Sequence, residues 1–363
     1  MTRARLFERY LLREVTQSWL AVTVVLLAIM LATRFARFLG DAASGQLPKE
    51  LLFQVAGLSS MQYLIVLTPI SLLLAVMMAL GRLYRDQEIT ALLACGVPLT
   101  TLYRPVMLLA AGICVLTAVM SFELGPWAGR TADRLVADAA RNNRYNPFEA
   151  GRFTDVGAVN ATLYTGQVSS DGSEIRNFFA VQRLADRRVA VVVSDGGGSA
   201  ADPATGARIV TLESGHRYEG RQGESAFDVI GFDSITVRIP PPAFAELSNK
   251  RKLAPSAELR QSEALPDRAE WAFRIAVPIS VLILALLAVP LSHVRPRSGR
   301  YGRMVIGVVL YLVYSQTITL AQVWIANGTL PPMLGIWWVH AIFAALALAL
   351  DVPSRRGGAR EAL

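Results

Sequence analysis

Long runs without a charged side chain constrain this chain more than any other feature of its sequence. The five longest runs cover residues 15–33, 51–81, 105–122, 275–292 and 304–350. About 20 apolar residues cross the hydrocarbon core of a bilayer as a helix. The last run is too long for one helix, and its Asn-Gly-Thr-Leu-Pro-Pro segment at 327–332 divides it into two. The sequence therefore predicts six membrane-spanning helices.

The second run, residues 51–81, is longer than one crossing requires. Its first part is expected to lie along the membrane surface or to enter the bilayer obliquely. Pro69 is expected to kink the helix, because proline removes one backbone hydrogen bond from the interior of a helix.

Composition and charge placement support a membrane protein. Mean hydropathy is +0.39 and 53% of the residues are hydrophobic, which is unusual for a soluble chain. Residues 125–270 hold 18 of the 36 basic residues and 19 of the 28 acidic ones, so the net charge of +8 comes from the remainder. Basic residues in short loops mark the cytoplasmic side, so both termini and residues 82–104 and 293–303 are expected there. This placement does not indicate nucleic-acid binding.

The middle of the chain has a different pattern. Apolar residues alternate with polar ones at 161–168, 175–183, 188–195, 207–214 and 227–239. Turn-forming residues separate these stretches at 170–172, 196–198, 203–206 and 220–223. Short strands at this spacing predict an antiparallel β-sandwich or jellyroll domain, inserted between the third and fourth spans on the side of the membrane opposite the termini.

These patterns predict three regions of the chain. Residues 1–124 would form a basic N-terminal helix on the cytoplasmic surface and spans one to three. Residues 125–266 would form the β domain with its linkers, and residues 267–363 spans four to six with a basic cytoplasmic tail.

Catalytic and metal-binding motifs are not found in the sequence. There is no Walker-type phosphate loop, no G-x-S-x-G and no H-E-x-x-H. The predicted spans contain almost no ionisable residue, which disfavours an ion-coupled carrier and an intramembrane enzyme. Cys95 and Cys114 lie far apart along helical stretches, so no disulfide, metal or cofactor is expected in this chain. Such a chain needs a partner as its source of energy.

Residues 82–96, RLYRDQEITALLACG, form the most informative polar stretch between two spans. Charged residues fall on one face of the expected helix, and apolar residues recur at helical spacing. They are Arg82, Arg85, Asp86 and Glu88 on the polar side, and Leu83, Ile89, Leu92 and Leu93 on the apolar side. The pattern predicts a short amphipathic helix at a membrane surface, where a soluble partner could bind. A plain interfacial helix that fixes the turn between two spans is the alternative.

The same stretch, GRLYRDQEITALLACGV, closely resembles the lipopolysaccharide-export permeases of the LptF/LptG family. The opening F-x-R-Y-L-x-R-E, from Phe7 to Glu14, resembles the family as well, and so does the order of three spans, an inserted β domain and three spans. The resemblance implies that the β domain is a periplasmic antiparallel β-jellyroll. Ala94-Cys95-Gly96 is similar to the LptF branch. The resemblance covers nearly the whole chain.

The resemblance implies a permease subunit without an ATPase site of its own. Its implied partners are an LptG-type sister permease, an LptB-type ATPase dimer that binds ATP and Mg²⁺, and LptC- and LptA-type jellyroll proteins. The assembly would extract lipopolysaccharide from the inner membrane of a Gram-negative bacterium and pass it to a periplasmic bridge toward the outer membrane. Within the family an acidic residue of the cytoplasmic helix enters a groove in the ATPase. Glu88 matches that position, and Arg82, Arg85 and Asp86 would lie at the rim of the contact.

Two further sets of residues are candidates for contact with lipid. Arginines near the ends of spans suit the phosphates of lipopolysaccharide, although anchoring at the interface is an equally good explanation; they are Arg34, Arg37, Arg130 and Arg134. Alternating apolar residues of the β domain would form its interior, as core or as a lining for acyl chains; they are Leu163, Phe179, Val181, Val191, Val193, Ile209, Val229 and Phe232.

Two other functions remain compatible with the residues. One is an envelope scaffold that signals through its β domain without transporting anything. The other is an ABC permease for a different lipidic cargo such as a lipoprotein. Co-purification with an ATPase and a sister permease would distinguish a transporter from a scaffold.

Overall fold

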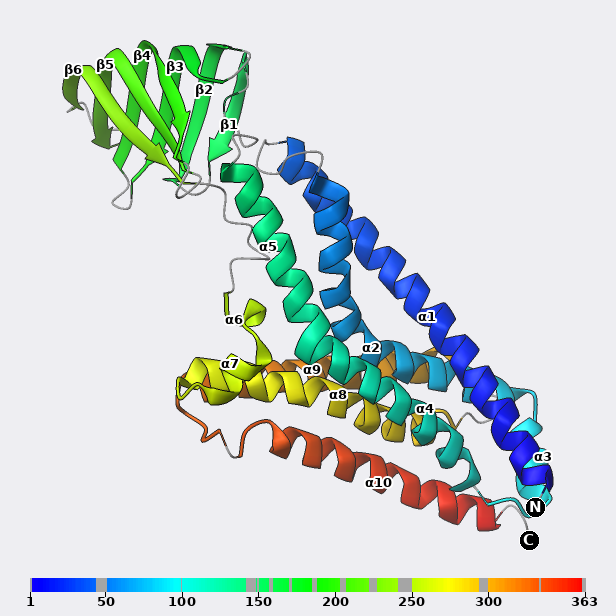
Figure 1. Ribbon diagram of the computed structural model, residues 1–363. Coiled ribbons are helices and arrows are strands. Elements are labelled where there is room, and N and C mark those ends of the chain that lie inside the picture. The colour runs from blue at the N-terminus through cyan, green and yellow to red at the C-terminus, as the bar shows by residue number, and fades with distance from the viewer. Residues whose placement is uncertain are drawn as a thin grey trace. The chain divides into compact units, whose positions relative to one another are not determined.

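The computed structural model describes most of the chain, in ranges separated by short gaps. The ranges are residues 2–43, 51–98, 100–141, 148, 150–156, 159–169, 172–184, 188–202, 207–221, 227–240, 250–293, 300–332 and 334–360. These residues form two compact units (Figure 1). The first unit comprises residues 1–32, 59–129 and 250–363, and the second comprises residues 33–58 and 130–249.

Helices precede and follow the strands along the chain. The N-terminal helices are α1 (Thr2–Ala43), α2 (Leu52–Arg85), α3 (Glu88–Ala94), α4 (Thr100–Val119), the π-helical turn η2 (Met120–Leu124) and α5 (Gly125–Arg141). The C-terminal helices are α6 (Lys250–Leu253), α7 (Ser256–Gln261), α8 (Leu265–Leu291), α9 (Arg300–Ala326) and α10 (Trp337–Arg360). Pro69 lies inside α2, which is one helix throughout its length.

Five helical segments of the described chain are long and apolar enough to cross a membrane. They are Leu6–Gly40, Leu52–Arg85, Thr100–Asp138, Leu265–Leu291 and Gly302–Ala326. Helix α10 adds a shorter apolar segment, Trp337–Asp351, at the position of the sixth predicted span. The fold class expected from the charge-free runs, a helical membrane protein with an inserted β domain, is confirmed.

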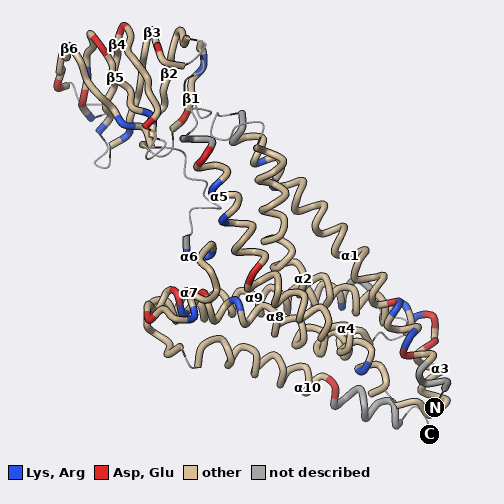
Figure 2. Tube along the Cα trace, in the orientation of Figure 1, with Lys and Arg blue, Asp and Glu red and all other residues tan. Residues whose placement is uncertain are grey.

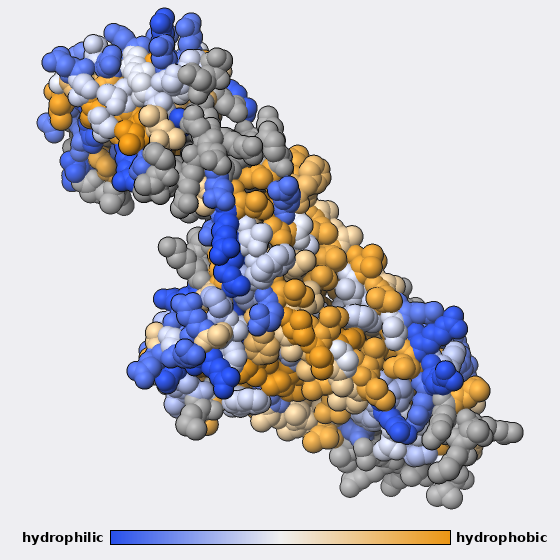
Figure 3. Space-filling model, viewed as in Figure 1, coloured by the Kyte–Doolittle hydropathy of each residue, from blue (hydrophilic) through white to orange (hydrophobic). Residues whose placement is uncertain are grey.

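Helix α8 is the central element of the first unit, and α4, α9 and α10 pack against it. Its buried side includes Ala276, Ala285 and Ala288, and such small residues let neighbouring helices approach closely in a membrane. By contrast, the most apolar window of α1 has no buried residue, and little of the corresponding window of α9 is buried. Figure 3 shows apolar residues over α1 and α4, with hydrophilic residues gathered near α7 and near α3.

The second unit contains one antiparallel sheet with strands in sequence order. They are β1 (Arg152–Val156), β2 (Ala161–Val168), β3 (Glu174–Arg183), β4 (Arg188–Ala201), β5 (Arg208–Arg221) and β6 (Phe227–Ile239). Five of them match predicted strands, and β1 was not predicted. An apolar cluster covers one face of the sheet and includes Leu163, Ile175, Phe178, Val210 and Leu212.

One predicted turn is wrong. Residues 196–198, Gly-Gly-Gly, lie inside β4, where Gly197 pairs with Leu212 of β5. A Cβ atom at Gly197 would lie 2.2 Å from the carbonyl oxygen of Thr211, so only glycine fits this close approach of two strands. The predicted turn at 203–206 lies outside the described residues.

Candidate functional site

The predicted helix 82–96 is two pieces. Helix α2 continues through Arg82 and Arg85, and α3 begins only at Glu88. Between them Gln87 has a φ of 60°, in the left-handed region that interrupts a helix. The amide of Asp86 donates to the carbonyl of Arg82 at 2.9 Å and closes the last turn of α2. The expectation of one continuous amphipathic helix is therefore wrong, because this turn separates the two pieces.

The amphipathic character of the segment is nevertheless present. Leu83 and Ile89 are buried in the main apolar cluster of the first unit, and Leu93 packs against that cluster. Thr90, Ala91 and Ala94 are exposed on α3, and Cys95 is exposed directly after it. Helix α3 is thus attached to the helical unit along one side and open along the other.

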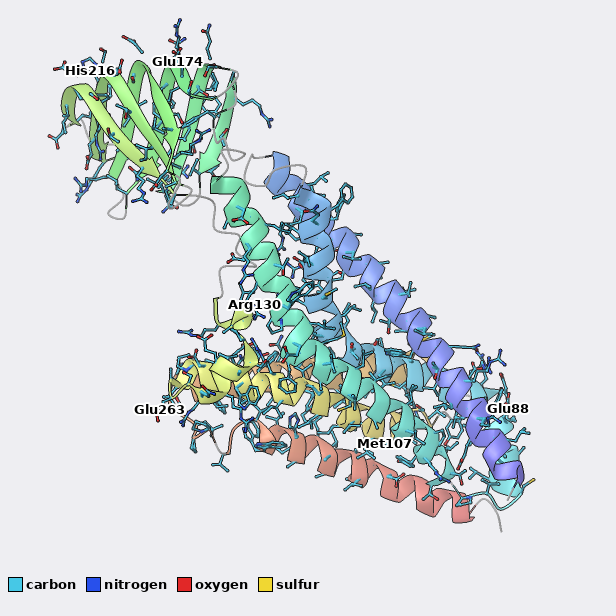
Figure 4. All side chains as sticks on the ribbon, in the orientation of Figure 1. Glu88, Met107, Arg130, Glu174, His216 and Glu263 are labelled. Carbon is cyan, nitrogen blue, oxygen red and sulfur yellow. The ribbon has the colours of Figure 1, made fainter. Side chains whose placement is uncertain are left out.

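The charged residues at this turn form contacts with α1. Nη1 of Arg82 lies 3.1 Å from Oε1 of Glu14, and Nη2 donates to the hydroxyl of Tyr10 at 3.2 Å. The Tyr10 hydroxyl in turn donates to Oε1 of Glu88 at 3.5 Å. Glu88 is the first residue of α3, where a carboxylate is favourably placed next to free backbone amides. Figure 4 labels Glu88 beside the first turns of α1.

The four candidate residues therefore have different surroundings. Arg82 is directed toward α1, whereas Arg85 and Asp86 form an exposed pair at 3.6 Å. Glu88 is half-buried. Figure 2 shows the basic and acidic residues gathered at this end of the helices.

A charged site that the sequence interpretation missed lies inside α8. Glu270 and Arg274 are 7% and 3% exposed, and Nε of Arg274 lies 3.4 Å from Oε1 of Glu270. The amide of Gln322 on α9 donates to Oε2 of Glu270 at 3.1 Å. The predicted fourth span began at Ile275, whereas α8 begins at Leu265, so both residues fell just outside the predicted span. Their spacing of four residues was the available signal, because it places both side chains on one face of a helix.

The guanidinium of Arg274 connects several segments. Nη1 donates to Oγ of Ser256 at 2.8 Å, and Nη2 donates to the carbonyl of Lys252 at 3.0 Å. Ser256 itself donates to the carbonyl of Phe122 in η2 at 2.5 Å. Arg274 therefore fixes α6 and α7, the return from the β domain, to α8 and, through Ser256, to η2.

The four arginines proposed for lipid phosphates all belong to the second unit or its edge. Arg34 and Arg37 lie on α1, and Arg130 and Arg134 lie on α5. A small apolar cluster joins these two helical segments through Phe38, Val55 and Ala132, with other residues packed against it. The structure thus brings the two pairs of arginines to segments that pack together. Contact with a phosphate stays a prediction.

The assignment of the sheet interior is largely wrong. Leu163 lies in the buried cluster and Phe232 packs against it. In contrast, Val193, Ile209 and Val229 are 41%, 37% and 57% exposed. The remaining three residues are only partly buried; they are Phe179, Val181 and Val191. They lie on the same face as Val193, because Phe179 pairs with Val193 and Val181 pairs with Val191 across β3 and β4.

A positive backbone torsion in β3 explains why Phe179 and Val181 were assigned to the wrong face. Ile175 is 1% exposed, and strict alternation from it would put Phe179 and Val181 on the buried face. Asn177 has a φ of 53°, and beyond it Phe178 and Ala180 are the buried residues. Ser214 in β5 has a φ of 52°, with buried residues on both sides at Leu212 and Gly215. A residue with such a torsion reverses the faces of the strand, so a pattern of period two changes phase at that point.

The fold and the segment at α3 together define a multi-pass helical membrane protein with an inserted β domain and a short, partly exposed helix between two spans. The model of the family described as "Lipopolysaccharide export system permease LptF/LptG" matches residues 9–350. The chain belongs to this family.

Individual relatives give the same result. The chain is 33% identical over 354 residues to the lipopolysaccharide export system permease protein LptF of Escherichia coli strain K12, covering 96% of each chain. It is equally similar to LptF of Shigella flexneri. These matches place the chain among the LptF-like members of a bacterial inner-membrane lipopolysaccharide export system.

Proposed function

We propose that this chain is one half of a permease pair that extracts lipopolysaccharide from the inner membrane and passes it to a periplasmic jellyroll bridge. Its sister would be an LptG-type permease, and LptC- and LptA-type proteins would continue the path. ATP and Mg²⁺ bind to an LptB-type ATPase dimer, since no Walker-type loop is found in this sequence. The termini and α3 face the cytoplasm, and the β domain faces the periplasm, in agreement with the basic residues near α3.

The observation that carries this proposal is the attachment of α3 to the helical unit along one side only. Its apolar side is fixed in the helical core through Ile89, and its other side is exposed. A movement of an ATPase bound to that exposed side would therefore be transmitted to α2 and α4. Glu88 begins α3 and contacts Tyr10 of α1, so it connects the partner surface to a second span.

A co-purification experiment tests this proposal. The chain is co-expressed with its sister permease and ATPase, and ATPase retention is compared for wild type, Glu88→Ala and Glu88→Lys. We expect weaker retention for Glu88→Ala and the lowest for Glu88→Lys, because reversing a charge at a contact repels the group that it attracted. Glu123→Ala removes an exposed carboxylate from η2 and serves as the matched control. Equal retention by all four proteins would contradict the coupling role of Glu88.

A further inference from the structure

A pocket of about 390 Å³ lies between α7, the first half of α8 and the beginning of α10. Among its lining residues are two arginines, two tryptophans and a histidine; they are Arg260, Arg268, Trp271, Trp337 and His340. All of them belong to the helical unit, and none is among the residues assigned above to the ATPase or to lipopolysaccharide. Figure 4 labels Glu263 at the junction of α7 and α8, the end of the unit where the pocket lies.

The α8 wall of the pocket changes from charged to apolar along the helix. Arg268 comes first, Trp271 follows one turn later, and Ile275 and Ile279 follow at further intervals of four residues. This spacing puts the four side chains on one face of the helix. Tryptophan is enriched at the level of lipid headgroups, and aliphatic residues lie deeper in the bilayer. The wall therefore has the polarity profile of one lipid molecule, from headgroup to acyl chain.

The charge at the mouth of the pocket is positive. Of the described residues, no carboxylate lies within ion-pair distance of Arg260 or Arg268, and Arg268 donates only to the carbonyl of Ser262 at 3.4 Å. The neighbouring carboxylate, Asp267, is engaged by Arg251 at 3.5 Å and by Ser262 at 2.7 Å. Both arginines are exposed and so accessible to an anion. Guanidinium groups match the geometry of phosphate oxygens.

His340 gives a second, independent indication of a ligand. It is 6% exposed, lines the pocket, and its Nδ1 lies 2.7 Å from the hydroxyl of Tyr314. Its other ring nitrogen, Nε2, is buried and has no hydrogen-bond partner among the described residues. Buried polar atoms are nearly always hydrogen-bonded, so an oxygen of a bound molecule would complete this site.

We propose that this pocket binds one anionic phospholipid of the surrounding bilayer. Its phosphate lies at Arg260 and Arg268, an oxygen near the headgroup accepts from or donates to His340, and an acyl chain follows Ile275 and Ile279. The bound lipid bridges α7, α8 and α10 at the membrane edge. This lipid is a resident ligand and is separate from any exported cargo.

Lipid binding to the purified full-length chain in detergent tests the proposal. Native mass spectrometry measures the affinity for phosphatidylglycerol and for phosphatidylcholine, which has the same phosphate but no net charge. We expect wild type to bind one phosphatidylglycerol about tenfold more tightly than phosphatidylcholine. This factor corresponds to the free energy of about one charge-assisted hydrogen bond. The variant Arg260→Gln/Arg268→Gln removes this preference, and His340→Phe weakens binding of both lipids. Arg176→Gln, an exposed arginine on β3, is the matched control and retains the preference.

Several results would overturn the proposal. Equal affinity of wild type for the two lipids would do so without any variant. Inorganic phosphate that binds without lipid and depends on the same arginines would mean a free-phosphate site. Lipopolysaccharide that displaces phosphatidylglycerol with the same arginine dependence would place the pocket on the export path. None of these measurements involves the ATPase, so a failure here leaves the proposed coupling through α3 unaffected.

Discussion

Arg274 and Glu270 form an ion pair one turn apart inside α8, with Nε and Oε1 separated by 3.4 Å and both side chains less than 10% exposed. Buried charges are costly unless they are paired and hydrogen-bonded. The guanidinium also donates to Ser256 and to the carbonyls of Arg251 and Lys252, which lie in the segment between the last strand and α8. The pair therefore determines where the return segment meets α8.

Removing one member of this pair is expected to be strongly destabilising. Arg274→Met leaves the Glu270 carboxylate buried without its cation, at a cost of about 3–5 kcal/mol in the free energy of unfolding. Thermal unfolding of the detergent-purified chain measures this change. The double variant Glu270→Gln/Arg274→Met, which leaves no buried charge, should recover part of the loss. A double variant that is less stable than Arg274→Met alone would contradict this assignment.

The two neighbouring glycines of β4 offer a matched test of strand packing. Gly197→Ala places a Cβ atom 2.2 Å from the Thr211 carbonyl oxygen, and overpacking of this kind costs about 1–3 kcal/mol. At Gly198 the nearest atom would be 3.9 Å away, so Gly198→Ala should change stability by less than about 0.5 kcal/mol. Protease resistance of the β domain in the full-length chain distinguishes the two. Equal resistance of the two variants would refute the close approach at Gly197.

The sheet also shows what the sequence pattern could and could not predict. The alternation of apolar and polar residues identified five of the six strands, because it can be recognised within each short stretch of sequence by itself. It assigned Phe179 and Val181 to the wrong face, because Asn177 has a positive φ value that changes the phase within β3, and nothing in the pattern marks it. The spans were predictable from the absence of charge. The same criterion missed Glu270 and Arg274, since it ended the span at the first charged residue.

Helix α3 should lose its attachment when Ile89 is truncated. Ile89 is 1% exposed, and replacing a buried isoleucine by alanine costs about 2–5 kcal/mol. Hydrogen exchange of the α3 amides should therefore become at least about tenfold faster in Ile89→Ala, since local opening needs less free energy. Thr90→Ala, at the exposed neighbour, should leave the exchange rates nearly unchanged. Similar exchange in wild type and Ile89→Ala would show that Ile89 does not fix the helix.

Arg82 and Glu14 should be energetically coupled. Their contact at 3.1 Å is partly exposed, so a double-mutant cycle with Arg82→Ala and Glu14→Ala should give a coupling of about 0.2–1 kcal/mol. The thermal stability of the four proteins at low salt measures it, and high salt should reduce it. If the stability losses of the two single variants simply add in the double variant, the Arg82–Glu14 contact does not stabilise the packing of α2 against α1.

ATP-driven transfer of lipopolysaccharide tests the central claim most directly. The chain, its sister permease and the ATPase are reconstituted in liposomes, and transfer to a soluble jellyroll acceptor is measured for wild type, Glu88→Lys and Glu123→Ala. The proposed coupling through α3 predicts that Glu88→Lys abolishes transfer while the chain stays folded in the liposome, and that Glu123→Ala transfers like wild type. Transfer by Glu88→Lys at the wild-type rate would contradict the role of Glu88 as the point where ATP hydrolysis acts on this permease.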